Sequence, residues 1–221
     1  MISETYNTDC LEAMRAMDDN HWDLAICDPP YGIGEQGHCR TRKKHNYTVV
    51  HASKKWDFER PSVEYFQELF RVSKNQIIWG ANYFTQFLPA SMGWIFWDKQ
   101  IGGDFSDGEL AFTSQQRALK VFTQWNGNNG IARIHPTQKP VALYKWLLTN
   151  YAKPGDTILD THGGSFSSRI ACWDLGFDFT GFEMDKSYFD AAEKRFADHI
   201  AQPKLFMPTP QPMIQEAMQF A

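Results

Sequence analysis

Short apolar runs alternate with amphipathic segments along the chain, which is the pattern of an α/β domain. The runs at 23–27, 76–79, 157–160 and 179–182 predict buried strands of a parallel sheet. Further strands are predicted at 2–7, 94–99, 109–113 and 118–122, the last two as candidates for an antiparallel pair. Apolar residues at helical spacing predict helices at 11–17, 61–74, 141–151, 169–175 and 187–200.

The turn Asp28-Pro29-Pro30-Tyr31 follows the strand at 23–27. Neither proline has an amide hydrogen to give to a sheet, so the strand must end at Asp28. The carboxyl edge of an open α/β sheet is where ligands bind. A carboxylate, a backbone carbonyl that no helix uses and an aromatic ring in one rigid turn suit a flat, amine-bearing ring such as a nucleobase.

The sequence 160–168, Asp-Thr-His-Gly-Gly-Ser-Phe-Ser-Ser, lies between a predicted strand and a predicted helix. Strand, small-residue loop and helix in succession let the backbone approach a nucleotide. Folds of this kind hold ribose hydroxyls with an acidic residue about 20 positions after the loop. Glu183, followed by Met184 and Asp185, stands at that spacing after the strand at 179–182.

The Asp-Pro-Pro-Tyr turn resembles the catalytic motif of the amino-methylating DNA methyltransferases, which act on adenine N6 or cytosine N4. The loop after the strand at 157–160 is similar to the cofactor motif of that family, an Asp followed by Pro-Phe-x-Gly-x-Gly. Asp160, Gly164 and Ser165 match it, whereas Thr161 and His162 replace the Pro and Phe. Phe166 stands where the last glycine is expected, so we expect it to crowd the cofactor or to oppose a positive φ.

A third motif, His135-Pro-Thr-Gln-Lys139-Pro140, leads into the helix at 141–151. Pro140 suits the first helical position, and Lys139 beside a helix start suits an anion. The alternative is a capped helix start without a ligand. The hexapeptide resembles the family motif that lines the methionine end of the cofactor pocket.

Asp9 and Cys10 follow the first predicted strand. Asp9 is a candidate N-cap for the helix at 11–17. The resemblance also implies a contact between an acidic residue at this point and the adenine of the cofactor, and the two roles are compatible.

The order of these motifs is similar to that of the beta class of amino-methyltransferases. The resemblance therefore implies a Rossmann-like class I methyltransferase with a single, mostly parallel twisted sheet, helices on both faces and a circularly permuted motif order. It implies S-adenosyl-L-methionine as cofactor, double-stranded DNA as substrate, and an adenine-specific transfer to the N6 amine of a flipped-out base. The residues that it assigns to the cofactor are Asp9, Cys10, His135, Lys139, Pro140, Asp160, His162, Gly163, Gly164, Ser165, Phe166, Ser167, Glu183, Met184 and Asp185, and the catalytic residues are Asp28, Pro29, Pro30 and Tyr31.

The alternatives are N4-cytosine methylation, methylation of RNA or of a protein glutamine, and a catalytically silent DNA-binding relative. Relatives that methylate RNA or protein generally carry Asn in place of Asp28. Phe166, in place of a motif glycine, is the feature that supports the hypothesis of a catalytically silent relative.

Within a predicted basic segment at about 35–56, residues 36–55 contain six positive residues and no acidic one, in a chain of net charge −4. Lys and Arg neutralise DNA phosphates without reading sequence, so this segment is the predicted backbone contact. A solvated loop is the alternative. The six residues are Arg40, Arg42, Lys43, Lys44, Lys54 and Lys55. Recognition loops are expected within 98–130.

The chain of 221 residues is long enough for one such domain, which we place at 1–200, with a Pro-rich tail at 201–221. Four cysteines without a CxxC pair, and no signal peptide or apolar run of bilayer length, predict a reduced cytoplasmic protein without a metal site. Residues 202–206 resemble a peptide that binds the sliding clamp, and packing of Leu205 and Phe206 on the domain is the favoured alternative. The tryptophans Trp79, Trp94 and Trp97 are expected in the core. The sequence leaves monomer and dimer open.

Overall fold

The structure is a computed structural model that describes residues 1–33, 59–101, 106–125 and 133–202. Its strands are β1 (Ser3–Tyr6), β2 (Trp22–Cys27), β3 (Ser73–Trp79), β4 (Trp94–Asp98), β5 (Gly108–Thr113), β6 (Lys120–Thr123), β7 (Thr157–Asp160) and β8 (Asp178–Phe182). Its helices are α1 (Cys10–Arg15), α2 (Val63–Val72), α3 (Val141–Tyr151), α4 (Ser167–Leu175) and α5 (Lys186–Ala201), with two short 3₁₀ turns at Ala81–Tyr83 and Thr85–Phe87.

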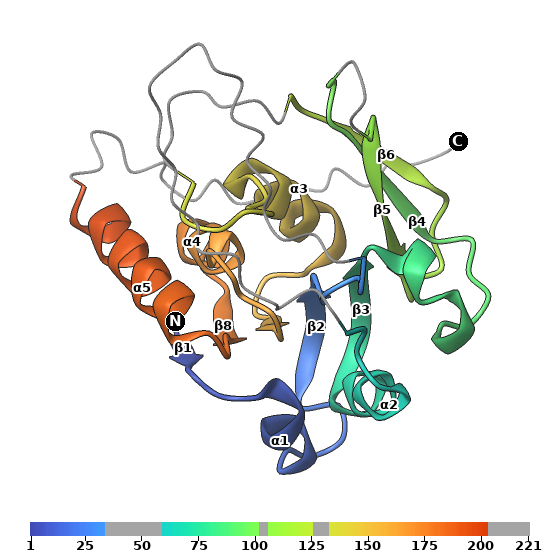
Figure 1. The fold of residues 1–221 in the computed structure, drawn as a ribbon, viewed down its shortest axis with the longest axis horizontal. Helices are drawn as coiled ribbons and strands as arrows, with labels where there is room; N and C mark the ends of the chain where they lie inside the picture. Colours follow the sequence, from blue (N-terminus) through green and yellow to red (C-terminus); the bar gives the residue numbers. More distant parts are fainter. Residues whose placement is uncertain (34–58, 102–105, 126–132, 203–221) are drawn as a thin grey trace, which may run out of the picture.

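The described strands form one sheet in the order β1-β8-β7-β2-β3-β5-β4-β6 (Figure 1). The first five strands of that order run parallel to one another. β5 is antiparallel to both β3 and β4, and β6 is parallel to β4. The prediction of a mostly parallel sheet is confirmed, and of the two candidate antiparallel strands only β5 is antiparallel.

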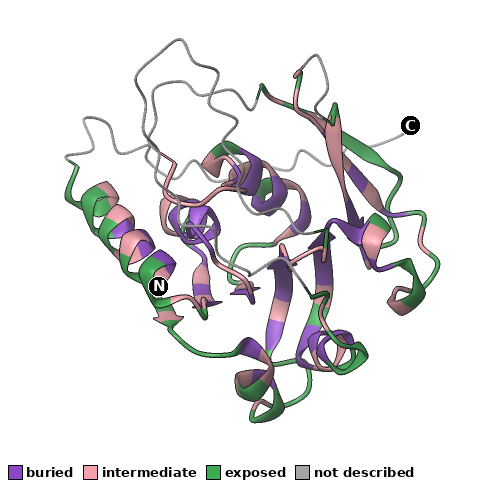
Figure 2. Cartoon of the chain, in the orientation of Figure 1, coloured by how far each residue is buried: buried purple, intermediate pink, exposed green. Residues whose placement is uncertain are grey.

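Helices cover both faces of the sheet because the side chains of its central strands alternate between two apolar cores. Leu24 and Ile26 of β2 pack in the core formed with α3, α4 and α5, whereas Ala25 and Cys27 pack with α1 and α2. Figure 1 shows these two helix layers on opposite sides of the strands, and Figure 2 shows that the central strands are largely buried. The α/β arrangement expected from the sequence, with helices on both faces of one sheet, is therefore present.

Three helix starts are capped by side chains as helix physics requires. Asp9 accepts from the Leu11 amide at 2.9 Å, Ser62 accepts from the Tyr65 amide at 3.3 Å, and Asp185 accepts from the Ser187 amide at 2.9 Å. The predicted role of Asp9 as a helix cap is confirmed.

The placement of Pro140 as the first helical residue is wrong by one position. Pro140 is the extended N-cap residue, with φ −67° and ψ 143°, and α3 begins at Val141. Helix α2 is also shorter than predicted, because Ser73 is extended and opens β3. Trp79 and Trp97 are fully buried as expected, whereas Trp94 is half-buried at the margin of the core shared with α1 and α2.

No described helix combines the length and apolar character needed to cross a membrane.

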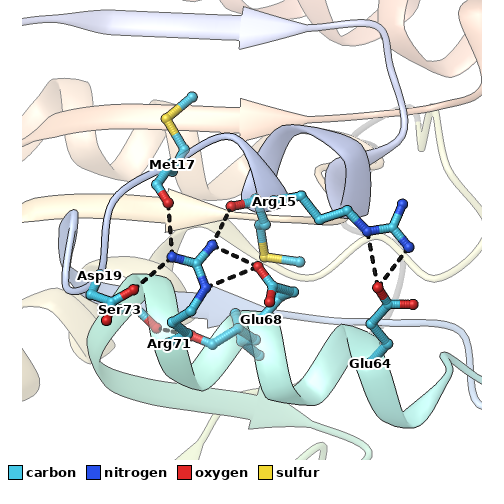
Figure 3. A network of polar contacts seen from close by, with 9 residues as sticks. Arg15, Met17, Asp19, Glu64, Glu68, Arg71 and Ser73 are labelled. Atoms are coloured by element: carbon cyan, nitrogen blue, oxygen red, sulfur yellow. Dashed lines mark hydrogen bonds and ion pairs between the residues drawn. The ribbon is translucent and has the colours of Figure 1, made fainter.

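Arg71, near the end of α2, ties the two helices of one layer together (Figure 3). Its guanidinium donates to the Met14 and Met17 carbonyls at 2.8 Å and pairs with Asp19 at 2.7 Å and Glu68 at 2.6 Å. Met14 lies in the last turn of α1, where its carbonyl also accepts from the Met17 amide at 3.1 Å, and Met17 follows the helix. Arg71 therefore links the end of α1 and the residues just after it to α2.

Replacing Arg71 by Ala should lower the melting temperature measurably, because two backbone carbonyls and two carboxylates lose their contact with the guanidinium at once. Arg15 of α1 offers a matched control, since its ion pair among the described residues is the surface contact with Glu64 at 2.7 Å (Figure 3). Exposed single ion pairs contribute little, so Arg15→Ala should leave the melting temperature nearly unchanged. Thermal unfolding followed by circular dichroism compares the two, and equal shifts would contradict the assignment.

Candidate functional site

A cavity of about 670 Å³ opens at the carboxyl edge of the parallel strands. Its walls are the segments that follow β1, β2, β7 and β8, together with the segment before α3 and parts of α3 and α5. We call it the edge cavity. The parallel direction of the strands explains why segments so far apart in the chain converge on it.

The loop after β7 lines the edge cavity with the backbone of Gly163 and Gly164, next to the side chains of His162 and Ser165. Gly164 adopts φ +52°, and its amide donates to Glu183 Oε2 at 2.8 Å. Glu183 Oε1 accepts from the Asp185 amide at 2.7 Å. A Cβ at Gly164 would make an ordinary van der Waals contact of 3.4 Å with the His135 ring, so the positive φ, and not a lack of space, favours glycine here. The carboxylate of Glu183 is thereby held in place beside the loop.

Phe166 lies in the core and not in the edge cavity. Its side chain is 0% exposed and makes edge contacts with Phe179 and Phe189, each at 6.2 Å between ring centroids. A Cβ on Gly163 would lie 1.9 Å from the Phe166 ring, so the ring occupies the space above that glycine. The prediction that Phe166 crowds the cofactor is therefore wrong. The expected conflict with a positive φ is real, because Phe166 adopts φ +49°.

A hydrogen bond between Asp160 and the backbone of His162 holds the start of the loop after β7. Asp160 is buried, and its carboxylate accepts hydrogen bonds from the His162 amide at 3.1 Å and from the Ser168 hydroxyl. Burial raises the pKa of Asp160 to about 7. His162 lines the edge cavity, and burial lowers its pKa to about 4, so its imidazole is neutral at pH 7.

The turn after β2 places Asp28 in the wall of the edge cavity with both carboxylate oxygens engaged. Oδ1 accepts from the Tyr31 hydroxyl at 2.6 Å, and Oδ2 accepts from the Lys139 ammonium. The Tyr31 ring stacks on Tyr83 at 5.1 Å and lies against Gly80, where a Cβ would come within 2.1 Å of it. Tyr31 therefore orients the carboxylate, while its ring packs between the β2 and β3 ends.

Glu109, at the start of β5, is the site residue that the sequence analysis missed. Its Oε2 lies 3.0 Å from Lys139 Nζ, and its Oε1 pairs with Lys99 at the end of β4. The only signal in the sequence is a carboxylate at the head of an otherwise apolar strand. Its relevance depends on the strand order, which the sequence does not give.

The structure brings most of the predicted site residues together. Those that line the edge cavity are Asp9, Cys10, Asp28, Pro30, His135, Lys139, His162, Gly163, Gly164, Ser165, Glu183, Met184 and Asp185. Those that do not line the cavity formed by the described residues are Pro29, Tyr31, Pro140, Asp160, Phe166 and Ser167. The predicted DNA contacts Arg40, Arg42, Lys43, Lys44, Lys54 and Lys55 lie outside the described residues.

The chain has the same architecture as several solved structures, among them a DNA methyltransferase. The chain superposes on the structure of an M1.HpyAVI–SAM complex with a TM-score of 0.59 at 18% identity, covering 88% of this chain and 98% of the other. It superposes on PvuII DNA methyltransferase, which is specific for cytosine N4, with a TM-score of 0.57 at 13% identity, covering 88% of this chain and 90% of the other. The fold is thus that of the class I S-adenosylmethionine-dependent methyltransferases.

The sequence places the chain within that class. The family model of the N6/N4 methyltransferases, described as DNA methylase, matches residues 78–194, more than half of the chain. The chain is also similar to the type II methyltransferase M.HpaI of Haemophilus parainfluenzae, with 25% identity over 85% of this chain and 72% of that protein. The chain belongs to the N6/N4 DNA methylase family, and its cofactor is S-adenosylmethionine.

The edge cavity fits that cofactor on its own chemistry. A glycine loop with a positive φ at Gly164 gives close backbone approach, and the carboxylates of Asp9 and Glu183 offer acceptors for hydroxyl and amine groups.

Substituting Phe166 by Gly should destabilise the protein without tightening cofactor binding. The glycine relieves the positive φ, but it deletes a buried phenyl ring, so the net loss of unfolding free energy is about 2–4 kcal/mol. Urea unfolding measures the loss, and calorimetric titration with S-adenosylhomocysteine measures the affinity. Phe166→Leu is the control that keeps much of the apolar volume. A tenfold gain in affinity in the glycine variant would show that the ring does obstruct the cofactor.

Proposed function

We propose that this DNA methyltransferase methylates adenine, at the exocyclic N6 amine of a base turned out of the duplex, within a short recognition sequence. The observation that carries this proposal is the position of Asp28. A carboxylate with both oxygens oriented stands in the wall of the same cavity that the glycine loop and Glu183 enclose.

Asp28 and the carbonyl of Pro29 would accept the two hydrogens of the target amine. The nitrogen lone pair of an aminopurine is delocalised into the ring, so the amine is a poor nucleophile. Two acceptors that pull its hydrogens out of the ring plane favour a tetrahedral nitrogen with a localised lone pair. Catalysis then depends on orientation and electrostatics.

S-adenosylmethionine, when bound, supplies an electrophilic methyl group on a sulfonium. Glu183 would accept hydrogen bonds from its ribose hydroxyls, because each carboxylate oxygen that holds a backbone amide has a second lone pair. One carboxylate oxygen of Asp9 accepts a hydrogen bond from the Leu11 amide of α1. Asp9 would also accept a hydrogen bond from the adenine amine of the cofactor. These roles follow from the family motifs and from the positions of both side chains on the edge cavity.

The choice of adenine over cytosine rests on the aspartate. The family resemblance associates the Asp form of the turn with adenine, while the fold alone does not discriminate, since the PvuII enzyme of the same fold acts on cytosine N4. N4-cytosine methylation is accordingly the second candidate. A DNA contact by the basic segment 35–56, a clamp contact by 202–206 and a cytoplasmic location stay predictions.

Expressing the chain in a host that lacks its own DNA methylases, followed by modified-base sequencing, tests the reaction. We expect N6-methyladenine at one short motif. Asp28→Ala should abolish it, because the methyl group leaves the target amine without the side-chain acceptor, and should leave binding of S-adenosylhomocysteine within about threefold. Methylcytosine in place of methyladenine would transfer the assignment to the second candidate. Methylation retained in the Asp28→Ala protein would remove Asp28 from the mechanism.

Glu183→Gln should weaken S-adenosylhomocysteine binding by roughly 10- to 100-fold, which is the effect of losing charge-assisted hydrogen bonds. The substitution weakens the acceptor for ribose and loosens the carboxylate bridge between Gly164 and Asp185. Glu12→Gln makes the same change of charge on the exposed face of α1 and serves as the control. Calorimetric titration gives both affinities, and an unchanged affinity for Glu183→Gln would contradict a ribose role.

A further inference from the structure

Lys139 is buried between two carboxylates at the edge cavity. Its side chain is 3% exposed, its ammonium donates to Asp28 Oδ2, and Glu109 Oε2 lies 3.0 Å away. Glu109 Oε2 accepts no hydrogen bond among the described residues, so its contact with Lys139 is ionic, and the directed hydrogen bond goes to Asp28. The indole ring of Trp79 lies 5.4 Å from the ammonium.

The burial of the Lys139 ammonium is compensated by a series of ion pairs in which acidic and basic side chains from four segments alternate. Lys99 pairs with Glu109, Glu109 with Lys139, and Lys139 with Asp28. The antiparallel pairing of β4 and β5 sets Asp98 opposite Gly108, which brings Lys99 and Glu109 to the same end of the sheet. Buried charges are tolerated when they are paired in this way, and removing one partner leaves the other uncompensated.

Lys139 therefore has no free charge to offer to an anionic ligand. The hexapeptide motif implies that Lys139 lies at the methionine end of the cofactor, where an ammonium would meet the carboxylate of that amino acid. In the structure two carboxylates already neutralise it. Burial alone would lower the pKa of Lys139, but Asp28 and Glu109 raise it above its ordinary value, which keeps the ammonium charged between them.

We propose that Lys139, backed by Glu109, is a positioning residue for the target base: it holds Asp28 as an ionised, oriented acceptor of the target amine, and does not neutralise the cofactor carboxylate. The inference rests on the proposed catalytic role of Asp28. Tyr31 fixes one carboxylate oxygen and Lys139 fixes the other, so the plane of the carboxylate is set by two donors. Only the ionised carboxylate is an acceptor at both oxygens, so only this form holds both donors and still offers a lone pair to the amine.

The charged and titratable groups around Asp28 come from every element that packs there. They are Lys139 and Tyr144 from the α3 region, Glu109 from β5, Tyr31 from the same turn and Asp160 from β7, with Lys99 behind Glu109. Burial raises the pKa of Asp28, Lys139 opposes that rise, and the negative charge of Glu109 adds to it. Removing Lys139 should move the pKa of Asp28 up, and removing the charge of Glu109 should move it down.

The test measures single-turnover methylation of DNA as a function of pH for the wild-type protein, Lys139→Met and Glu109→Gln. Lys139→Met should lose roughly 100-fold in rate at neutral pH and regain part of the loss at alkaline pH, because its Asp28 ionises only at higher pH. Glu109→Gln should move the acidic limb of the profile toward lower pH. Neither substitution changes Asp160, whose pKa is about 7, so the ionisation of Asp160 contributes to all three profiles alike. Both should bind S-adenosylhomocysteine within about threefold of the wild type.

Opposite displacements of the acidic limb support the inference, since a merely structural role would move neither. A rate loss that is the same at every pH overturns it. A tenfold or larger loss of S-adenosylhomocysteine affinity in Lys139→Met with an unmoved profile also overturns it and assigns Lys139 to the cofactor. If Lys139→Met does not fold, Glu109→Gln decides alone, and an unmoved limb there overturns the inference. A wild-type protein that methylates no base overturns the proposed function and this inference with it, whereas an active wild type with unmoved limbs overturns the inference alone.

Discussion

The common direction of β1, β8, β7, β2 and β3 is the constraint on which the site depends. Because these strands are parallel, the segments after β1, β2, β7 and β8 all emerge at one edge, where they enclose a single cavity. The strand order then makes β2 and β7 neighbours, although most of the chain separates them in sequence. The Asp28 turn after β2 and the glycine loop after β7 are therefore neighbours in space, although they lie far apart in the chain.

The antiparallel part of the sheet places one more charged residue, Glu109, next to Lys139. β5 lies next to β3 with the opposite direction, so its beginning, and not its end, lies at the carboxyl edge. That reversal brings Glu109 to the carboxyl edge from a strand whose described flanking residues do not line the cavity. Lys139 and Lys99 pull its pKa down to about 2 against the effect of burial, so Glu109 is an anion at any pH at which the protein works.

The sequence predicted most elements because their signals are local. Apolar runs and helical periodicity gave every strand and helix of the described residues to within a few positions, and the two prolines after Cys27 predicted the end of β2. What the sequence could not give is the register that sets Glu109 beside Lys139, since long-range pairing leaves no trace in one chain. The orientation of Phe166 was missed for a related reason. The comparison with a glycine-rich motif suggested an obstruction, whereas the core below the loop accepts the ring.

Phe166 and Gly163 also constrain how this loop can change over evolutionary time. The ring fills the space that a side chain at residue 163 would need, and its own backbone has the left-handed φ that suits glycine. A substitution at residue 163 alone meets the ring, and loss of the ring alone empties part of the core. The two positions are therefore epistatic. A path from this loop to the glycine-rich form passes through a less stable intermediate unless a neighbour such as Phe179 or Phe189 changes first to refill the space.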